Sequence, residues 1–182
     1  QLDRLMGELA EHIDLSGCTE YTVEAGRPDT ITAEKLAVLA RRGCSRVSVN
    51  PQTMQDAVLE RMGRAHRADD ILRAYALARE SGIGCINMDL IAGLPGDSAA
   101  GFRASLEQVL ALGPENVTVH TLALKKGSRL MEEGGGLPSG AAVADMLDFA
   151  WAALRAAGQR PYYLYRQKYM SGSFENVGWC RP

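Results

Sequence analysis

The stretch Cys85-Ile-Asn-Met-Asp-Leu-Ile-Ala92 predicts how this chain folds more directly than any other segment. Successive side chains of a β-strand point to opposite faces, so the apolar side chains at every second position share one face, and Asn87 and Asp89 share the other. Helices can cover the apolar face, whereas the polar face needs water, a ligand or hydrogen-bonding partners. The loop Gly93-Leu-Pro-Gly96 follows directly. It lacks the glycine spacing of nucleotide-binding loops, so we interpret it as a strand-to-helix turn.

The same alternation recurs along the chain, between segments whose apolar residues have helical spacing. Alternating strands and helices predict parallel strands joined by right-handed crossovers, either in an open doubly wound sheet or in a full or partial barrel. In a doubly wound sheet both faces are covered and the strands are almost wholly apolar, so the polar strand faces favour an α/β barrel. The predicted strands are residues 20–24, 46–50, 85–92, 116–123 and 160–165, and the predicted helices are residues 2–13, 33–42, 53–62, 69–80, 98–112 and 139–157.

Length and composition limit the classes of function. The 182 residues fit one domain, and the net charge of −2 comes from 20 basic and 22 acidic residues without charge blocks. This pattern argues against nucleic-acid and membrane-surface partners and favours a small-molecule partner. No run approaches the roughly 20 apolar residues of a membrane helix and no signal segment is evident, so we expect a cytoplasmic location.

The cysteines give no metal-binding pattern. Cys18, Cys44, Cys85 and Cys180 lie far apart, which matches neither close-spaced metal ligands nor a disulfide framework. We therefore expect most of them to be buried thiols, with Cys85 in its apolar run as the clearest case, and no metal site within these residues. The chain begins at Gln1 rather than at methionine, and we interpret residues 1–182 as one domain of a longer protein, truncated at both ends.

Polar residues or backbone groups are predicted at the carboxyl ends of four strands, where (β/α) barrels bind their ligands. These positions are Glu24, Gln52, Asp89 and Ala123. Buried carboxylates need cations or several hydrogen bonds. A ligand site and a satisfied internal network both remain open at this point.

Two further side chains are candidate contacts. Arg64 follows the helix predicted at 53–62, and a guanidinium can hold a carboxylate with two parallel hydrogen bonds. Alternatively, an arginine in this place is solvated or helps to end the helix. His120 faces the predicted barrel interior and is a possible substrate contact, although a neutral histidine is often simply packed and hydrogen-bonded.

Several stretches together resemble one family in order and spacing. The family is that of the oxygen-independent coproporphyrinogen III oxidases, also called coproporphyrinogen dehydrogenases, and the C-terminal segments are similar to its branch in Gram-positive bacteria. The stretches are Tyr21-Thr-Val-Glu-Ala-Gly-Arg-Pro28, Ser48-Val-Asn-Pro-Gln52, Asn87-Met-Asp-Leu-Ile-Ala-Gly-Leu-Pro95, Tyr162-Tyr-Leu-Tyr-Arg-Gln-Lys168 and Phe174-Glu-Asn-Val-Gly178.

The resemblance implies a radical S-adenosylmethionine (SAM) enzyme on an incomplete (β/α) barrel of about six strands. It implies that SAM is bound by Glu24, Gln52, Arg64, Asp89 and the backbone near Ala123. In this family a Cys-x-x-x-Cys-x-x-Cys loop holds a 4Fe-4S cluster, and nothing in the chain matches that loop. We therefore expect the cluster ligands to precede Gln1 and the 182 residues alone to be inactive.

The implied reaction transfers one electron from the cluster to SAM and abstracts hydrogen from a propionate side chain of coproporphyrinogen III. Loss of carbon dioxide and of one more electron leaves a vinyl group, and two rounds give protoporphyrinogen IX, with an unidentified electron donor as partner. The main alternative function is that of a haem-binding chaperone, because the family also contains such chaperones, and a second alternative is another radical SAM enzyme. A plain α/β domain with a structural polar network is the third.

Overall fold

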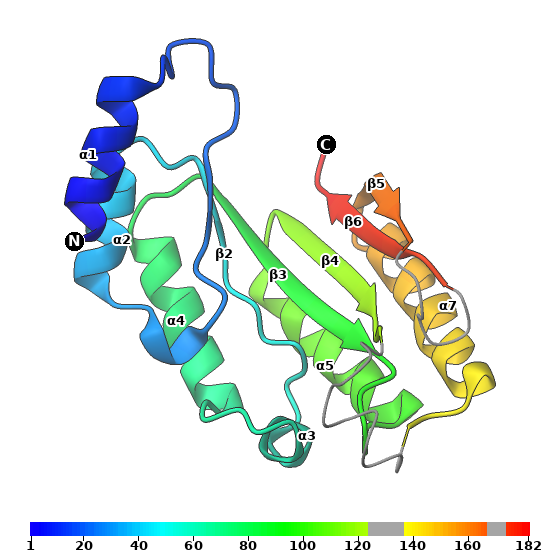
Figure 1. The fold of residues 1–182 in the computed structure, drawn as a ribbon. Coiled ribbons are helices and arrows are strands. Elements are labelled where there is room, and N and C mark those ends of the chain that lie inside the picture. The colour runs from blue at the N-terminus through cyan, green and yellow to red at the C-terminus, as the bar shows by residue number, and fades with distance from the viewer. Residues whose placement is uncertain (124–136, 167–173) are drawn as a thin grey trace.

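The computed structural model describes residues 1–123, 137–166 and 174–182. Its six strands form one mixed sheet in the order β1-β2-β3-β4-β6-β5, with helices packed along its outer side (Figure 1). The elements are α1 Leu2–His12, β1 Thr22–Glu24, the short 3-10 helix η1 Pro28–Thr30, α2 Ala33–Arg41, β2 Arg46–Ser48, α3 Asp56–Arg61, α4 Ala68–Glu80, β3 Cys85–Ala92, α5 Ala99–Leu112, β4 Asn116–Thr121, α7 Gly140–Ala156, β5 Arg160–Tyr165 and β6 Asn176–Cys180.

The first four strands are parallel and their register aligns the polar positions of neighbouring strands. Glu24 lies beside Ser48, Ser48 beside Asn87, and Asp89 beside Thr118. Because polar residues occupy the same parity in each strand, one face of the sheet carries a row of hydrogen-bonding side chains. The alternation of strands and helices predicted from the sequence is confirmed for β1 to β4.

The C-terminal edge of the sheet differs from the sequence-based expectation. β6 was not predicted, and it lies between β4 and β5 and pairs antiparallel with both. Only residues 166–175 connect β5 to β6, which is shorter than the crossover that parallel neighbours need, so an antiparallel pair is the available arrangement. The insertion leaves β5 running in the same direction as β4, one strand further out.

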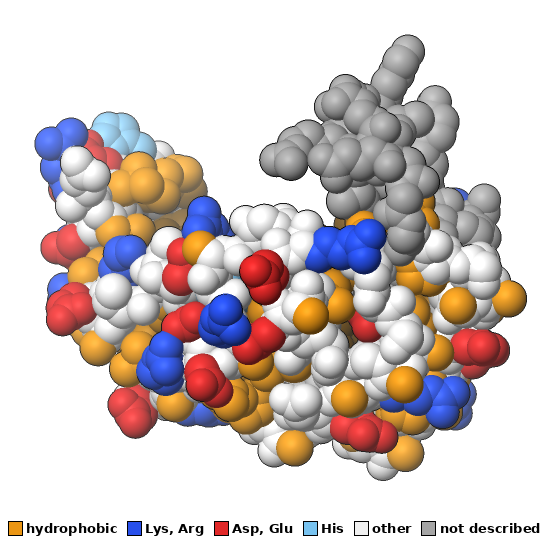
Figure 2. All heavy atoms as spheres, turned by 90° about the horizontal axis from the view of Figure 1, so that it is seen from below, with side chains coloured by type: hydrophobic (Ala, Val, Ile, Leu, Met, Phe, Trp, Pro, Cys, Tyr) orange, Lys and Arg blue, Asp and Glu red, His pale blue; other side chains and the backbone are white. Residues whose placement is uncertain are grey.

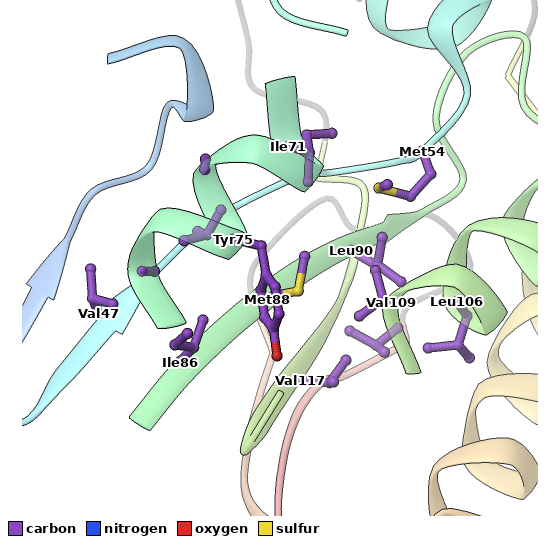
Figure 3. Close-up of a cluster of buried hydrophobic side chains, with 14 of the residues drawn as sticks. Val47, Met54, Ile71, Tyr75, Ile86, Met88, Leu90, Leu106, Val109 and Val117 are labelled. Carbon is purple, nitrogen blue, oxygen red and sulfur yellow. The ribbon is translucent and has the colours of Figure 1, made fainter. Parts of the chain in front are cut away.

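The core fills the space between the apolar sheet face and the helices. Ile86, Met88 and Leu90 on β3 are fully buried. Figure 3 shows them between Tyr75 on α4 and Val109 on α5, with further apolar side chains from β2 and β4 around them. The predicted apolar face of residues 85–92 is therefore the helix-covered face, which leaves Asn87 and Asp89 on the opposite, concave side.

Serine and threonine side chains begin three of the helices, as their sequence positions indicate. Thr32, Ser98 and Ser139 each accept a hydrogen bond from the backbone N–H three residues later. These contacts satisfy N–H groups that have no partner inside the helix. They fix where α2, α5 and α7 start.

A half-buried ion pair between Arg79 and Glu115 connects α4 to the start of β3. The Arg79 guanidinium donates to both carboxylate oxygens of Glu115, at 2.7 and 2.9 Å, and to the Gly113 carbonyl at 2.8 Å. Glu115 also accepts from the Ile86 backbone N–H at 2.9 Å. Burial by itself would raise the pKa of Glu115, but the Arg79 and Ile86 hydrogen bonds outweigh it and hold that pKa below its ordinary value.

Replacing Glu115 with glutamine is expected to lower the free energy of unfolding by about 1 to 2 kcal/mol near neutral pH, because a charge-assisted pair is lost. A carboxylate with a depressed folded-state pKa stabilises the fold above its unfolded-state pKa and loses that contribution as pH falls. The difference in the free energy of unfolding between the wild type and Glu115→Gln should therefore become smaller as the pH falls below 4.5, the ordinary pKa of the carboxyl group. Thermal melts across the acid range measure it, and a gap that does not change with pH would contradict the assignment.

Candidate functional site

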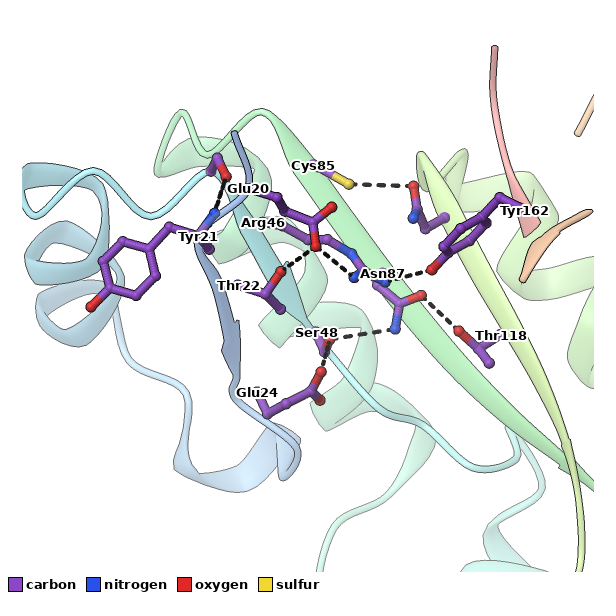
Figure 4. A network of polar contacts seen from close by, with 12 residues as sticks. Glu20, Tyr21, Thr22, Glu24, Arg46, Ser48, Cys85, Asn87, Thr118 and Tyr162 are labelled. Carbon is purple, nitrogen blue, oxygen red and sulfur yellow. Dashed lines mark hydrogen bonds and ion pairs between the residues drawn. The ribbon is translucent and has the colours of Figure 1, made fainter. Parts of the chain in front are cut away.

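A chain of hydrogen bonds crosses the four parallel strands on the concave face (Figure 4). Ser48 Oγ donates to Glu24 Oε1 at 2.8 Å, and Asn87 Nδ2 lies 3.4 Å from Ser48 Oγ. Thr118 Oγ1 then donates to Asn87 Oδ1 at 3.0 Å. Asn87 is buried at the centre of this chain, and it can serve both neighbours because an amide carries a donor and an acceptor.

Asp89 lies inside β3 rather than at its end, because the strand continues to Ala92. Asn87 Nδ2 donates to Asp89 Oδ1 at 2.7 Å, and His120 Nε2 lies 3.4 Å from Asp89 Oδ2. The side chain of Asp89 is 15% exposed and that of His120 is 24% exposed, so both are reachable from the concave side. One carboxylate oxygen thus fixes Asp89 in the network, and the other faces a histidine.

A cavity of about 400 Å³ opens over this network. It brings together three of the side chains predicted from the sequence, namely Glu24, Asp89 and His120. The other lining residues are Arg46, Asn87, Thr118, Tyr162 and Tyr163.

Sequence reasoning did not select Arg46, Tyr162 or Tyr163 as site residues. Arg46 lies two residues before Ser48 in the same strand, so its side chain points to the same face, and the alternation of side chains could have identified it. Tyr162 and Tyr163 come from β5, and their place beside the cavity depends on the inserted strand β6.

Gln52 lies outside the lining of this cavity, and its backbone is unusual. Its N–H donates to the Asp89 carbonyl at 2.9 Å, and its carbonyl accepts from the Ile91 N–H at 2.9 Å. Its φ of 69° lies in the left-handed region, which costs a residue other than glycine about 1 kcal/mol or more. The two hydrogen bonds to β3 hold this strained backbone in place and anchor the loop after β2.

Arg64 and Ala123 also lie outside the cavity lining. The Arg64 backbone N–H closes the end of α3 by donating to the Leu59 carbonyl at 2.9 Å. Its side chain is half-buried and has neither a hydrogen bond nor an ion pair among the residues that the structure describes. Ala123 lies two residues after the end of β4 and is the last residue before the undescribed segment 124–136.

The cysteines do not fit an iron-sulfur cluster within this chain. The expectation that most of the thiols are buried is wrong, because Cys44 is buried but Cys85 and Cys180 are half-buried and Cys18 is exposed. No three thiols converge anywhere in the described residues. The one close set of metal-type ligands there is Glu8, Glu11 and His12 on the exposed surface of α1. Carboxylates are not the ligands that such clusters use, so this set is unsuited to one.

The sequence matches the family model described as "Radical SAM superfamily" over residues 5–109, which is more than half of the chain. The chain belongs to the radical SAM superfamily. Within this superfamily it is 42% identical to the oxygen-independent coproporphyrinogen-III oxidase-like protein HemZ of Bacillus subtilis, over all of this chain and 37% of the relative. It is 33% identical to the haem chaperone HemW of the same organism, over 89% of this chain and 44% of the relative.

A solved radical SAM structure shows the same fold. The coproporphyrinogen III oxidase HemN of Escherichia coli superposes with a TM-score of 0.81 at 25% identity, covering 100% of this chain and 39% of that protein. This match confirms the predicted partial barrel. The chain spans less than half the length of each of these radical SAM relatives.

The surface adds two observations about partners. None of the described helices is long and apolar enough to span a membrane. On the face shown in Figure 2, acidic and basic side chains are intermixed, without a large patch of one sign.

Proposed function

We propose that the complete protein carrying this chain catalyses the radical SAM oxidative decarboxylation of coproporphyrinogen III to protoporphyrinogen IX in haem biosynthesis. The observation that carries the proposal is the concave cavity, where two carboxylates and a histidine meet over four parallel strands. Similarity to an oxidase-like relative along the whole chain supports this choice of substrate.

The donor set suits SAM, which presents an ammonium, a carboxylate and ribose hydroxyls. Glu24 and Asp89 can accept hydrogen bonds from the ammonium or the ribose, and the Arg64 guanidinium, which has no ion pair among the described residues, can hold the carboxylate. We assign Gln52 and the backbone near Ala123 to the same cofactor. Bound SAM would supply the hydrogen-abstracting radical, while the protein orients the reactants and excludes competing reactions.

We further propose that the thiolates of the 4Fe-4S cluster lie outside these 182 residues, because the four cysteines of the chain do not converge. His120 is the proposed substrate contact. The Asp89 carboxylate can accept from His120 Nε2–H, which orients the ring and leaves Nδ1 for another contact.

The second candidate function is haem binding as a chaperone, because HemW chaperones are also similar to most of the chain. Haem and coproporphyrinogen III both carry propionate groups, so one cavity could accept either. The two functions differ in turnover rather than in the class of ligand.

The proposal predicts turnover in a defined assay. Complete, cluster-loaded protein incubated anaerobically with SAM, a reductant, an electron acceptor and coproporphyrinogen III should release carbon dioxide and form vinyl product. Asp89→Asn should reduce turnover about ten- to hundredfold, because a charge-assisted contact to the cofactor is lost. Stoichiometric haem binding without turnover of coproporphyrinogen III would favour the chaperone function instead.

A further inference from the structure

Among the described residues that line the cavity, Arg46 is the one arginine or lysine. It is the first residue of β2, and its side chain is only 13% exposed. Figure 4 shows its guanidinium between Glu20 and Tyr162, above Ser48 and Asn87 in this view. A cation this well covered needs hydrogen-bond acceptors on several sides.

The protein supplies only part of what the guanidinium needs. Nη1 lies 3.3 Å from Glu20 Oε1, and Nη2 donates to the Tyr162 hydroxyl at 3.1 Å. Nε is buried and has no hydrogen-bond partner among the described residues. A guanidinium carries five N–H donors, and beyond these two contacts its remaining protein neighbour is the Cys85 sulfur, a weak acceptor, so the protein's oxygen acceptors satisfy only two of the five.

The positive charge of Arg46 is also weakly balanced. Glu20 is 58% exposed, and its Oε1 atom also accepts from Thr22 Oγ1 at 2.8 Å, so solvent screens this ion pair. Burial raises the pKa of the neighbouring Cys85 thiol, which stays neutral and adds no counter-charge. The other acids of the cavity, Glu24 and Asp89, have their own partners in the polar network.

The Tyr162 hydroxyl adds a matched donor. Its oxygen accepts from Arg46, so its own O–H proton is directed to a different acceptor. The Tyr162 and Tyr163 rings meet edge to face, with centroids 4.9 Å apart, and form an apolar wall beside the cation. A cation, a hydroxyl donor and aromatic carbon side by side suit a carboxylate attached to an apolar body.

We propose that Arg46 and the Tyr162 hydroxyl bind a propionate carboxylate of a tetrapyrrole ligand in this cavity. This inference rests on the proposed function for the class of ligand, and it holds whether the tetrapyrrole is a substrate or a carried haem. Arg46 is then a substrate-binding residue at the start of β2, whereas Gln52 and Arg64, which we assign to SAM, follow the other end of that strand and lie outside the cavity lining.

The test compares each tetrapyrrole with its ester in the complete protein. Dissociation constants for coproporphyrin III, a stable oxidised analogue, and for haem are measured beside those for their methyl esters, in the wild type, Arg46→Gln and Arg46→Lys. Arg155→Gln on the exposed surface of α7 is the matched control for the loss of one charge.

For the free acid that the wild type binds, Arg46→Gln should raise the dissociation constant about tenfold or more, because a charge-assisted hydrogen bond is lost. Binding of the ester and of SAM should change less than twofold. Arg46→Lys should recover part of the affinity, because it keeps the charge without the planar fork. Arg155→Gln should behave as the wild type.

Three results would overturn the inference. If Arg46→Gln weakens the binding of acid and ester equally, Arg46 has a structural role. If only the affinity for SAM falls, Arg46 contacts the cofactor. If the wild-type protein binds no tetrapyrrole, the proposed class of ligand is wrong. Failure of the proposed reaction can be told apart from failure of this inference. If the protein binds haem but does not turn over coproporphyrinogen III, the role of Arg46 is still tested by comparing the affinities for haem and its methyl ester.

Discussion

Replacing Trp179 with alanine is expected to lower the free energy of unfolding by about 3 to 5 kcal/mol, the usual range for removing a large buried aromatic side chain. Trp179 is 1% exposed on β6, and its backbone pairs with Val117 on one side and Pro161 on the other. Its ring meets Trp151 of α7 edge to face at 4.7 Å. The substitution would therefore leave a cavity where the inserted strand joins the sheet to α7.

Trp151→Ala is the matched control, because the same ring type is 45% exposed there and should cost less than half as much. Denaturant unfolding of the complete protein, followed by far-ultraviolet circular dichroism, compares the two without depending on tryptophan emission. A loss for Trp179→Ala as small as that for Trp151→Ala would mean that β6 contributes little to the stability of this domain. A large loss confined to Trp179 would show that the C-terminal edge of the sheet is part of the core.

Replacing Arg64 with alanine is expected to weaken SAM binding about 30- to 150-fold, the effect of removing one partner of a charge pair worth about 2 to 3 kcal/mol. The melting temperature should hardly change, because the Arg64 side chain has no hydrogen bond or ion pair among the described residues. Calorimetric titration with SAM, together with a thermal melt of the complete protein, measures both quantities.

Arg155→Ala controls for the loss of one positive charge, since Arg155 is exposed near the end of α7. A lower melting temperature for Arg64→Ala with an unchanged SAM affinity would instead favour a structural polar network, the plain α/β reading. A lower SAM affinity with an unchanged melting temperature would support the cofactor role that the resemblance to the coproporphyrinogen oxidases implies for this position.

The sequence by itself determined which face of each parallel strand is polar. Alternation is a local property, so residues 85–92 placed Asn87 and Asp89 on the concave face before any strand was paired. The helices were equally predictable, because the spacing of apolar residues and the capping residues Ser98 and Ser139 act within a few positions of one another. For the same reason Glu24, Asp89 and His120 could be selected as facing one interior.

Only the tertiary structure decided what completes the cavity. Arg46 and Tyr162 are 116 positions apart, and they meet because β6 inserts antiparallel between β4 and β5. The left-handed backbone of Gln52 likewise depends on its hydrogen bonds to Asp89 and Ile91. Local periodicity holds no information on which strands become neighbours, because pairing is settled by connection length and by packing across the whole sheet.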